Sequence, residues 1–110
     1  MPIKVTYSDN TKIHYNSFDE IINNDNVIEI NCSNNNLTSL PDNMIFSNLT
    51  HFYCSNNKLT SLPPNMILPN LTYFNCSYNN LYYIPLHLNC CIHKDYNTKS
   101  PEYMRRKLLI

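Results

Sequence analysis

The feature that most constrains the fold of this chain is a repeat of 22 residues, which occurs three times in a row without gaps. The copies begin at Val27, Leu49 and Leu71, and together they span residues 27–92. A unit of this length cannot bury its apolar face alone, so it must stack on its neighbours. The sequence therefore predicts a solenoid in which residues one period apart lie side by side.

Within each copy, apolar and polar residues alternate over a short segment. In the second copy Phe52 and Cys54 alternate with His51 and Tyr53. Alternation with a period of two predicts a strand with one buried and one exposed face. Strands from consecutive copies should pair in parallel, about 4.8 Å apart. The invariant columns include Cys32, Cys54 and Cys76, then Asn35, Asn57 and Asn79, and also Pro41, Pro63 and Pro85.

This pattern resembles the leucine-rich repeat, whose signature is L-x-x-L-x-L-x-x-N/C-x-L. The second copy matches it with Leu49, Phe52, Cys54, Asn57 and Leu59. Cys replaces a Leu of the signature, and it fits that position because it behaves as a small buried hydrophobe. The resemblance implies an α/β solenoid, a short leucine-rich-repeat horseshoe with parallel strands on its concave face. It also implies that the Asn column is structural.

The residues before the repeats are expected to form an N-terminal cap over 1–26, because the first coil would otherwise expose its core. The segments 3–7 and 12–15 alternate around a turn, which predicts a β-hairpin. Ser17 and Glu20 have the spacing of a capping box, which predicts a short helix that runs to about Asn24.

The residues after the repeats, 93–110, are expected to form a C-terminal cap helix. Ser100 and Pro101 supply its N-cap and first-turn residues. In the return segments between strands, the prolines at 63, 64 and 69 lack amide donors and oppose an α-helix. We therefore expect extended or 3-10 structure in the return segments.

Composition excludes several functional classes. Eight Lys+Arg balance eight Asp+Glu, so the charge excess of a nucleic-acid or anionic-membrane binder is missing. The sequence contains no run of about 18 apolar residues, so no membrane span is predicted. Glycine is absent, which excludes Gly-rich phosphate-binding loops and leaves Asn to occupy turns with positive φ. No secretory signal is visible, so we expect an intracellular, cytoplasmic protein with reduced thiols.

The outward strand positions are the candidate binding residues, because the concave face is the usual binding face in the resembling family. They mix aromatic rings with adaptable polar groups, as protein interfaces do. The predicted partner-binding residues are Glu29, Asn31, His51, Tyr53, Tyr73, Asn75 and Tyr78, and the column of Ser33, Ser55 and Ser77 is also expected to face outward.

The cysteines allow a competing hypothesis of a metal or redox site. The column of Cys32, Cys54 and Cys76 offers three soft ligands. Burial raises the pKa of a thiol, however, so core packing is favoured for this column and no cofactor is expected. A second cluster has the spacing H-x-x-C-C-x-H, which matches no common zinc motif, and its capacity to bind metal is left open. This cluster consists of His87, Cys90, Cys91 and His93.

The sequence thus predicts a non-enzymatic module that binds another protein, with neither nucleic acid nor membrane as a partner. A structural repeat protein without a selective partner is the alternative. Catalysis by Glu29, His51 and Tyr73 is disfavoured, because no nucleophile or oxyanion pocket is recognisable beside them. The composition, with Cys at an inward position and abundant Asn, is also similar to repeat proteins of giant DNA viruses that infect amoebae. In that case the cytoplasm would be the host's.

Overall fold

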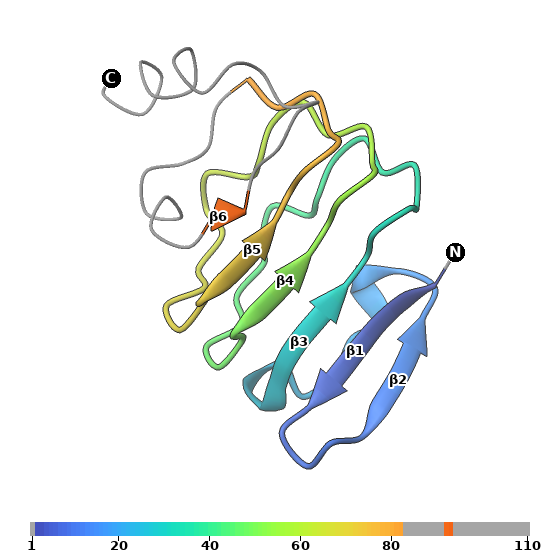
Figure 1. Cartoon of the computed structure of the whole chain (residues 1–110). Helices are drawn as coiled ribbons and strands as arrows, with labels where there is room; N and C mark the ends of the chain where they lie inside the picture. The colour runs from blue at the N-terminus through green and yellow to red at the C-terminus, as the bar shows by residue number, and fades with distance from the viewer. Residues whose placement is uncertain (1, 83–91, 94–110) are drawn as a thin grey trace.

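The computed structural model describes residues 2–82 and 92–93. These residues form one six-stranded sheet with the strand order β2-β1-β3-β4-β5-β6 (Figure 1). The return segments of the chain run behind the sheet, on the side where its apolar side chains lie. The strands are β1 (Ile3–Tyr7), β2 (Lys12–Tyr15), β3 (Val27–Asn31), β4 (His51–Tyr53), β5 (Tyr73–Asn75) and β6 (Ile92–His93).

Strands β3 to β6 pair in parallel, as the repeat predicts. The register aligns Ile30 with Phe52 and Phe52 with Phe74. All three side chains are fully buried, and the rings of Phe52 and Phe74 stack with their centroids 5.4 Å apart. The prediction that residues one period apart are spatial neighbours is confirmed.

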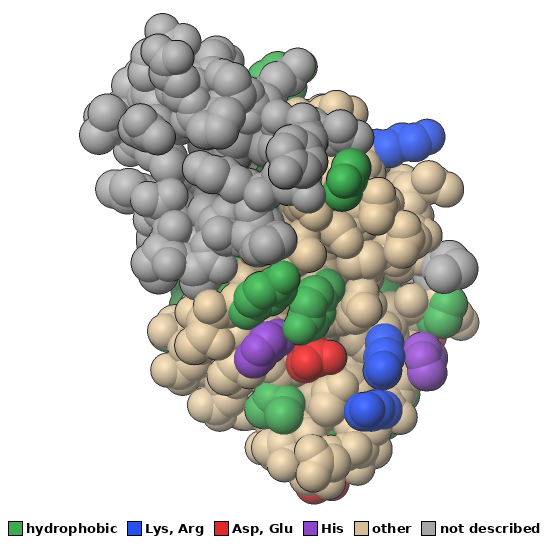
Figure 2. All heavy atoms as spheres, in the orientation of Figure 1, with side chains coloured by type: hydrophobic (Ala, Val, Ile, Leu, Met, Phe, Trp, Pro, Cys, Tyr) green, Lys and Arg blue, Asp and Glu red, His purple; other side chains and the backbone are tan. Residues whose placement is uncertain are grey.

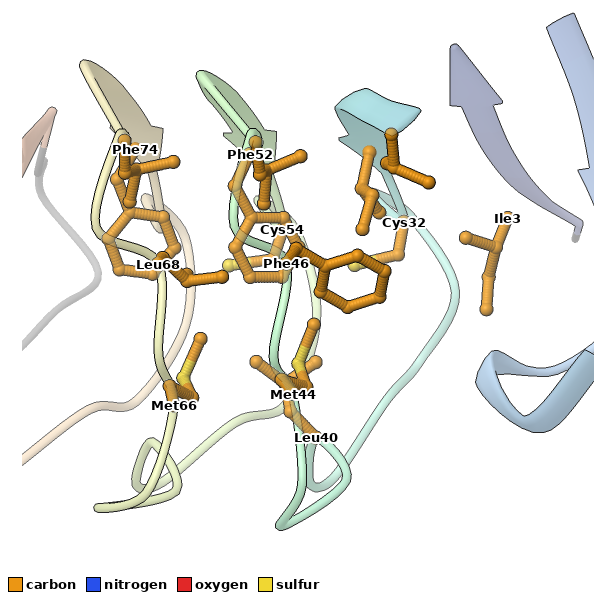
Figure 3. Packing of buried hydrophobic residues seen from close by; sticks show 14 of the residues in the cluster. Ile3, Cys32, Leu40, Met44, Phe46, Phe52, Cys54, Met66, Leu68 and Phe74 are labelled. Carbon is orange, nitrogen blue, oxygen red and sulfur yellow. The ribbon is translucent and has the colours of Figure 1, made fainter. Parts of the chain in front are cut away.

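The core lies between the sheet and the return segments. Met44 and Met66 face the inward side chains of the strands from consecutive coils (Figure 3). The return segments at 41–48 and 63–70 contain turns on either side of one bridging residue each, and an isolated parallel bridge joins Ile45 and Ile67. Extended pairing, one of the two expected structures, is found at this bridge. No α-helix occurs within residues 2–82 and 92–93, so the helical part of the predicted α/β solenoid is represented there only by 3-10 turns.

The predicted hairpin forms, and β1 pairs antiparallel with β2. Strand β1 also pairs antiparallel with β3, aligning Thr6 with Glu29 and Lys4 with Asn31. The hairpin thereby extends the repeat sheet, which becomes mixed. Ile3, Val5 and other inward residues of β1 join the common core.

The short helix expected to run from Ser17 to about Asn24 is wrong. Two 3-10 turns, η1 (Phe18–Glu20) and η2 (Asn24–Asn26), replace it. The Glu20 carboxylate accepts the Ser17 amide at 3.0 Å, as in a capping box. The next residue, Ile21, is extended and only 8% exposed. Burial of the Ile21 side chain thus requires the backbone to leave the helical conformation after one turn.

The predicted cap helix at 93–110 lies outside the described residues, apart from β6, as does the return segment at 83–91. In the part of the chain that is described, no helix has the length and apolar character needed to cross a membrane.

The invariant Asn column connects consecutive coils by hydrogen bonds. The Asn57 side-chain amide donates to the carbonyl oxygens of Cys32 and Cys54, at 3.1 and 3.0 Å. Its Oδ1 accepts the backbone N–H groups of Asn35 and Leu37, at 3.0 and 2.9 Å. One buried carboxamide therefore satisfies backbone groups of two coils at the point where the strands end.

Asn79 repeats this arrangement one coil later. Its amide donates to the carbonyl oxygens of Cys54 and Cys76, and its Oδ1 accepts the Leu59 amide at 3.0 Å. Asn35 differs because no repeat precedes it. Its amide donates to the Cys32 carbonyl, but its buried Oδ1 has no hydrogen-bond partner among the described residues. All three side chains of this asparagine ladder thus bond to the backbone, and Asn35 makes the fewest of these bonds.

Asn57→Ala is expected to lower the free energy of unfolding by roughly 3 kcal/mol, because it leaves the buried backbone N–H groups of Asn35 and Leu37 without their acceptor. Asn35→Ala removes the same side chain but only one hydrogen bond, and should cost about 1 kcal/mol. Urea unfolding followed by circular dichroism measures both. Equal losses in the two variants would contradict the ladder.

Candidate interaction face

The face of the sheet opposite the core, called the open face below, carries the outward side chains of the strands. Strand register places them in two rows that cross the sheet. We define the open face by one row of Thr6, Glu29, His51 and Tyr73 and a second row of Lys4, Asn31, Tyr53 and Asn75.

Three rings on the open face contact one another, and we call them the aromatic cluster: His51, Tyr53 and Tyr73. The centroid of His51 lies 6.3 Å from Tyr53 and 5.9 Å from Tyr73, with interplanar angles of 24° and 23°. The two tyrosine rings are tilted, with centroids 5.3 Å apart. All three side chains are half-buried, so the cluster is an ordered surface feature. Its rings come from adjacent strands because the period of the repeat aligns them.

The orientation of His51 is fixed by its neighbour Thr50. The Thr50 hydroxyl donates its single hydrogen to the carbonyl oxygen of Ile28, at 3.0 Å. The same oxygen lies 2.9 Å from Nδ1 of His51. Since the hydroxyl hydrogen is already used, Nδ1 must be the donor in this second bond. The hydrogen bond thereby holds the imidazole in place within the aromatic cluster.

Glu29 borders the aromatic cluster, because β3 places it directly beside His51 in the adjacent strand. Burial raises the pKa of Tyr53, and the nearby Glu29 carboxylate raises it further, followed by Tyr73. Glu29 is half-buried, and in the described part of the chain no hydrogen bond or ion pair to its carboxylate occurs. The open face therefore holds a carboxylate beside three rings.

Asn31 and Asn75 also lie on the open face, but their carboxamide oxygens serve the backbone. Oδ1 of Asn31 accepts the Ser33 amide at 3.0 Å. Oδ1 of Asn75 accepts the Ser77 amide at 3.1 Å and the Ser77 hydroxyl at 2.6 Å. Ser77 is only 4% exposed, although its hydroxyl bonds the outward carboxamide of Asn75. Its hydroxyl is buried with a partner, which removes the cost of burying it.

The sequence interpretation missed the part of the open face that the hairpin contributes. Lys4 and Thr6 lie in the same rows as the repeat residues. Strand β2 adds Lys12 opposite Thr6 and His14 opposite Lys4. The alternation of residues 3–7 marks Lys4 and Thr6 as outward, but only the pairing of β1 with β3 places them beside Glu29. Figure 2 shows lysine and histidine side chains over this end of the sheet.

Tyr78 lies in the turn after β5, and within the described residues its ring contacts none of the three rings of the aromatic cluster. Its backbone is left-handed, with φ of 56°, and its side chain is 41% exposed. The corresponding positions in the first two repeats are Asn34 and Asn56, with φ of 62° and 55°. Asn tolerates this conformation better than Tyr does, so Tyr78 carries local backbone strain.

Tyr78→Asn is expected to raise the free energy of unfolding by about 1 kcal/mol, because it restores the residue that the same turn uses in the other repeats. Thermal unfolding measures the change. Asn56→Tyr is the matched control and should destabilise by a similar amount. A lower stability of Tyr78→Asn would show that packing of the ring outweighs the strain.

The cysteine column is inward, as predicted. Burial raises the pKa of Cys32 to about 12 and raises that of Cys54 well above the ordinary thiol value. Within the described residues no group of three or more His, Cys, Asp or Glu side chains is placed to hold a metal ion. The side chains of the cluster at 87–93 lie outside what the structure describes, so metal binding there stays a hypothesis.

These raised pKa values predict that the protein loses stability at alkaline pH. The pKa of Cys32 rises from 9.0 to about 12 on folding, and that of Tyr7 rises from 10.0 to about 12, mainly through burial. In both cases the unfolded chain ionises first. Their contribution is therefore complete below about pH 9 and is lost as the pH rises toward 12. Urea unfolding at several pH values between 8 and 11 should show a decreasing free energy of unfolding.

Cys32→Ala serves as the control for this dependence, and its stability should decline less steeply with pH than that of the unaltered chain. A free energy of unfolding that stays constant from pH 8 to pH 11 would contradict the buried, neutral state of these groups.

Comparison with known proteins gave one family match, which covers part of the repeat. Residues 47–85 match the family model described as Leucine Rich repeats (2 copies). No curated protein and no solved structure gave a significant match. The matched residues include β4 and β5, and therefore all three rings of the aromatic cluster.

Proposed function

We propose that this chain, a leucine-rich-repeat protein, is a non-enzymatic module that binds another protein through the open face. Domains built from leucine-rich repeats are generally protein-interaction modules, and the described strands form a continuous surface of the corresponding kind. The partner-binding residues proposed are Glu29, Asn31, His51, Tyr53, Tyr73 and Asn75, with Tyr78 at the margin.

The aromatic cluster is the observation that carries this proposal. Tyrosine and histidine rings offer large contact areas together with polar tips, and tyrosine is enriched at protein interfaces. The contacts between His51, Tyr53 and Tyr73 order these side chains before any partner arrives. Ordering them in advance lowers the entropy cost of binding, which favours recognition.

A catalytic role for Glu29, His51 and Tyr73 receives less support than binding. The three residues do lie side by side in the sheet. Within the described part of the chain, however, they stand on an open sheet face, and no described segment encloses them to separate a substrate from water. We therefore propose that this row contributes contacts and charge, and no bond-making step.

The triple variant His51→Ala, Tyr53→Ala and Tyr73→Ala is expected to abolish affinity capture of the partner from extracts of the source cell. Loss of the aromatic contacts should weaken binding at least tenfold, because aromatic side chains dominate interface energies. The variant should remain folded by circular dichroism, since the core side of the strands is unchanged.

The matched control is the double variant Ile45→Ala and Ile67→Ala. These side chains are 50% and 51% exposed in the return segments, on the opposite side of the molecule. The control should capture the partner as the unaltered chain does. Undiminished capture by the folded triple variant would reject the open face as the binding surface, and no capture above background by the unaltered chain would favour a structural repeat protein.

A further inference from the structure

Building on the function proposed above, we propose that the open face recognises an arginine side chain of its protein partner. The guanidinium group would bind the Glu29 carboxylate and lie against the rings of the aromatic cluster, with Tyr53 as the principal contact. The argument begins with what happens to Glu29 when a partner covers this face.

Glu29 lies near the middle of the open face, between the hairpin and the aromatic cluster. A partner that covers the three rings must also remove water from the adjacent carboxylate. Within the described residues this carboxylate has no ion pair or hydrogen bond that would replace the water. Burial of an unpaired carboxylate is strongly unfavourable, so a partner that fits must supply a cation or strong donors.

The rings beside Glu29 favour the same ligand. A cation near an aromatic face is attracted by the electron-rich ring, and arginine is the residue that most often makes this contact. Burial and the Glu29 charge both raise the pKa of Tyr53, so the phenol stays neutral and the nearby potential is negative. The Glu29 carboxylate and the Tyr53 ring face thus both attract the same cation.

Arginine fits better than lysine, because its planar group can bind a carboxylate with two parallel hydrogen bonds while its flat side stacks on a ring. A lysine ammonium is compact and strongly hydrated, so removing its water on the same surface costs more free energy. Asn31 borders Tyr53 in the adjacent strand, and it adds a polar group at the edge of the site.

The lysines of the hairpin determine on which side of Glu29 the cation lies. Lys4 and Lys12 stand on the hairpin side of Glu29, in strands β1 and β2. Figure 2 shows an acidic side chain with lysines on one side and hydrophobic and histidine side chains on the other. Repulsion from the lysines keeps a partner cation on the aromatic side, and it favours a partner whose next residues are acidic or neutral.

Titration of the full-length chain with the peptide acetyl-Gly-Arg-Gly-amide tests this site. Amide chemical shifts in a ¹⁵N-labelled sample, recorded at low salt, report where the peptide binds. We expect shifts concentrated at Glu29, His51 and Tyr53. The same peptide with citrulline, which is uncharged and similar in shape to arginine, should bind at least fivefold more weakly, since it lacks both charge-dependent contributions.

Glu29→Gln is expected to weaken binding of the arginine peptide about fivefold and to leave binding of the citrulline peptide unchanged. Asp42→Asn is the matched control, because it removes an exposed carboxylate from a return segment. It should bind the arginine peptide as the unaltered chain does. The same peptide with lysine in place of arginine should bind less tightly than the arginine peptide.

Three results would overturn the arginine site: no shifts at the open face, equal binding of the arginine and citrulline peptides, or equal binding by the unaltered chain and Glu29→Gln. Affinity capture separates this failure from failure of the proposed function. Partner capture that is lost in the triple aromatic variant but retained by Glu29→Gln would reject the arginine site and leave the binding face in place.

Discussion

The structure depends on the way one buried carboxamide joins two coils. Strands in a short coil end after a few residues, and their terminal carbonyl and amide groups would be buried without partners. Asn57 binds the carbonyls of Cys32 and Cys54 together and accepts two amides of the preceding coil. The bonds hold consecutive coils in one register. Every column of the repeat, inward or outward, follows from this alignment.

The lack of glycine makes asparagine essential for the turns as well as for the ladder. Five of the positive-φ residues in the described part are asparagines, and Tyr78 is the sixth. Asparagine adopts the left-handed conformation at moderate cost because its short side chain bonds locally. The same residue type thus fulfils two separate requirements. The strain at Tyr78 arises where the third repeat departs from this rule.

Much of the repeat could be predicted from the sequence, because a period of 22 and an alternation of two leave few arrangements for residues such as Phe52 and His51. The pairing of β1 with β3 could not. The alternation in residues 3–7 identifies a strand and its outward side chains, but it does not specify which edge of the sheet the strand joins. The helix expected after Ser17 failed for a different reason, since burial of Ile21 overrides a local capping signal. The outward strand residues of the aromatic cluster were predicted to lie side by side. The positions of Lys4 and Lys12 relative to the Glu29 carboxylate, by contrast, follow only from the observed strand pairing.

The inward and outward side chains of each strand have different roles. Inward residues such as Phe52 and Cys54 fill a core with one layer of side chains per coil, so their size and polarity are fixed by packing. Outward residues contribute little to that core and can change without loss of the fold. Ring contacts nevertheless order His51, Tyr53 and Tyr73, and Glu29 stands beside them without a described intramolecular counterion. In the described part of the chain, the Glu29 charge forms no ion pair that would stabilise the fold. Recognition of a cation therefore explains the combination of ordered rings and a carboxylate better than stability does.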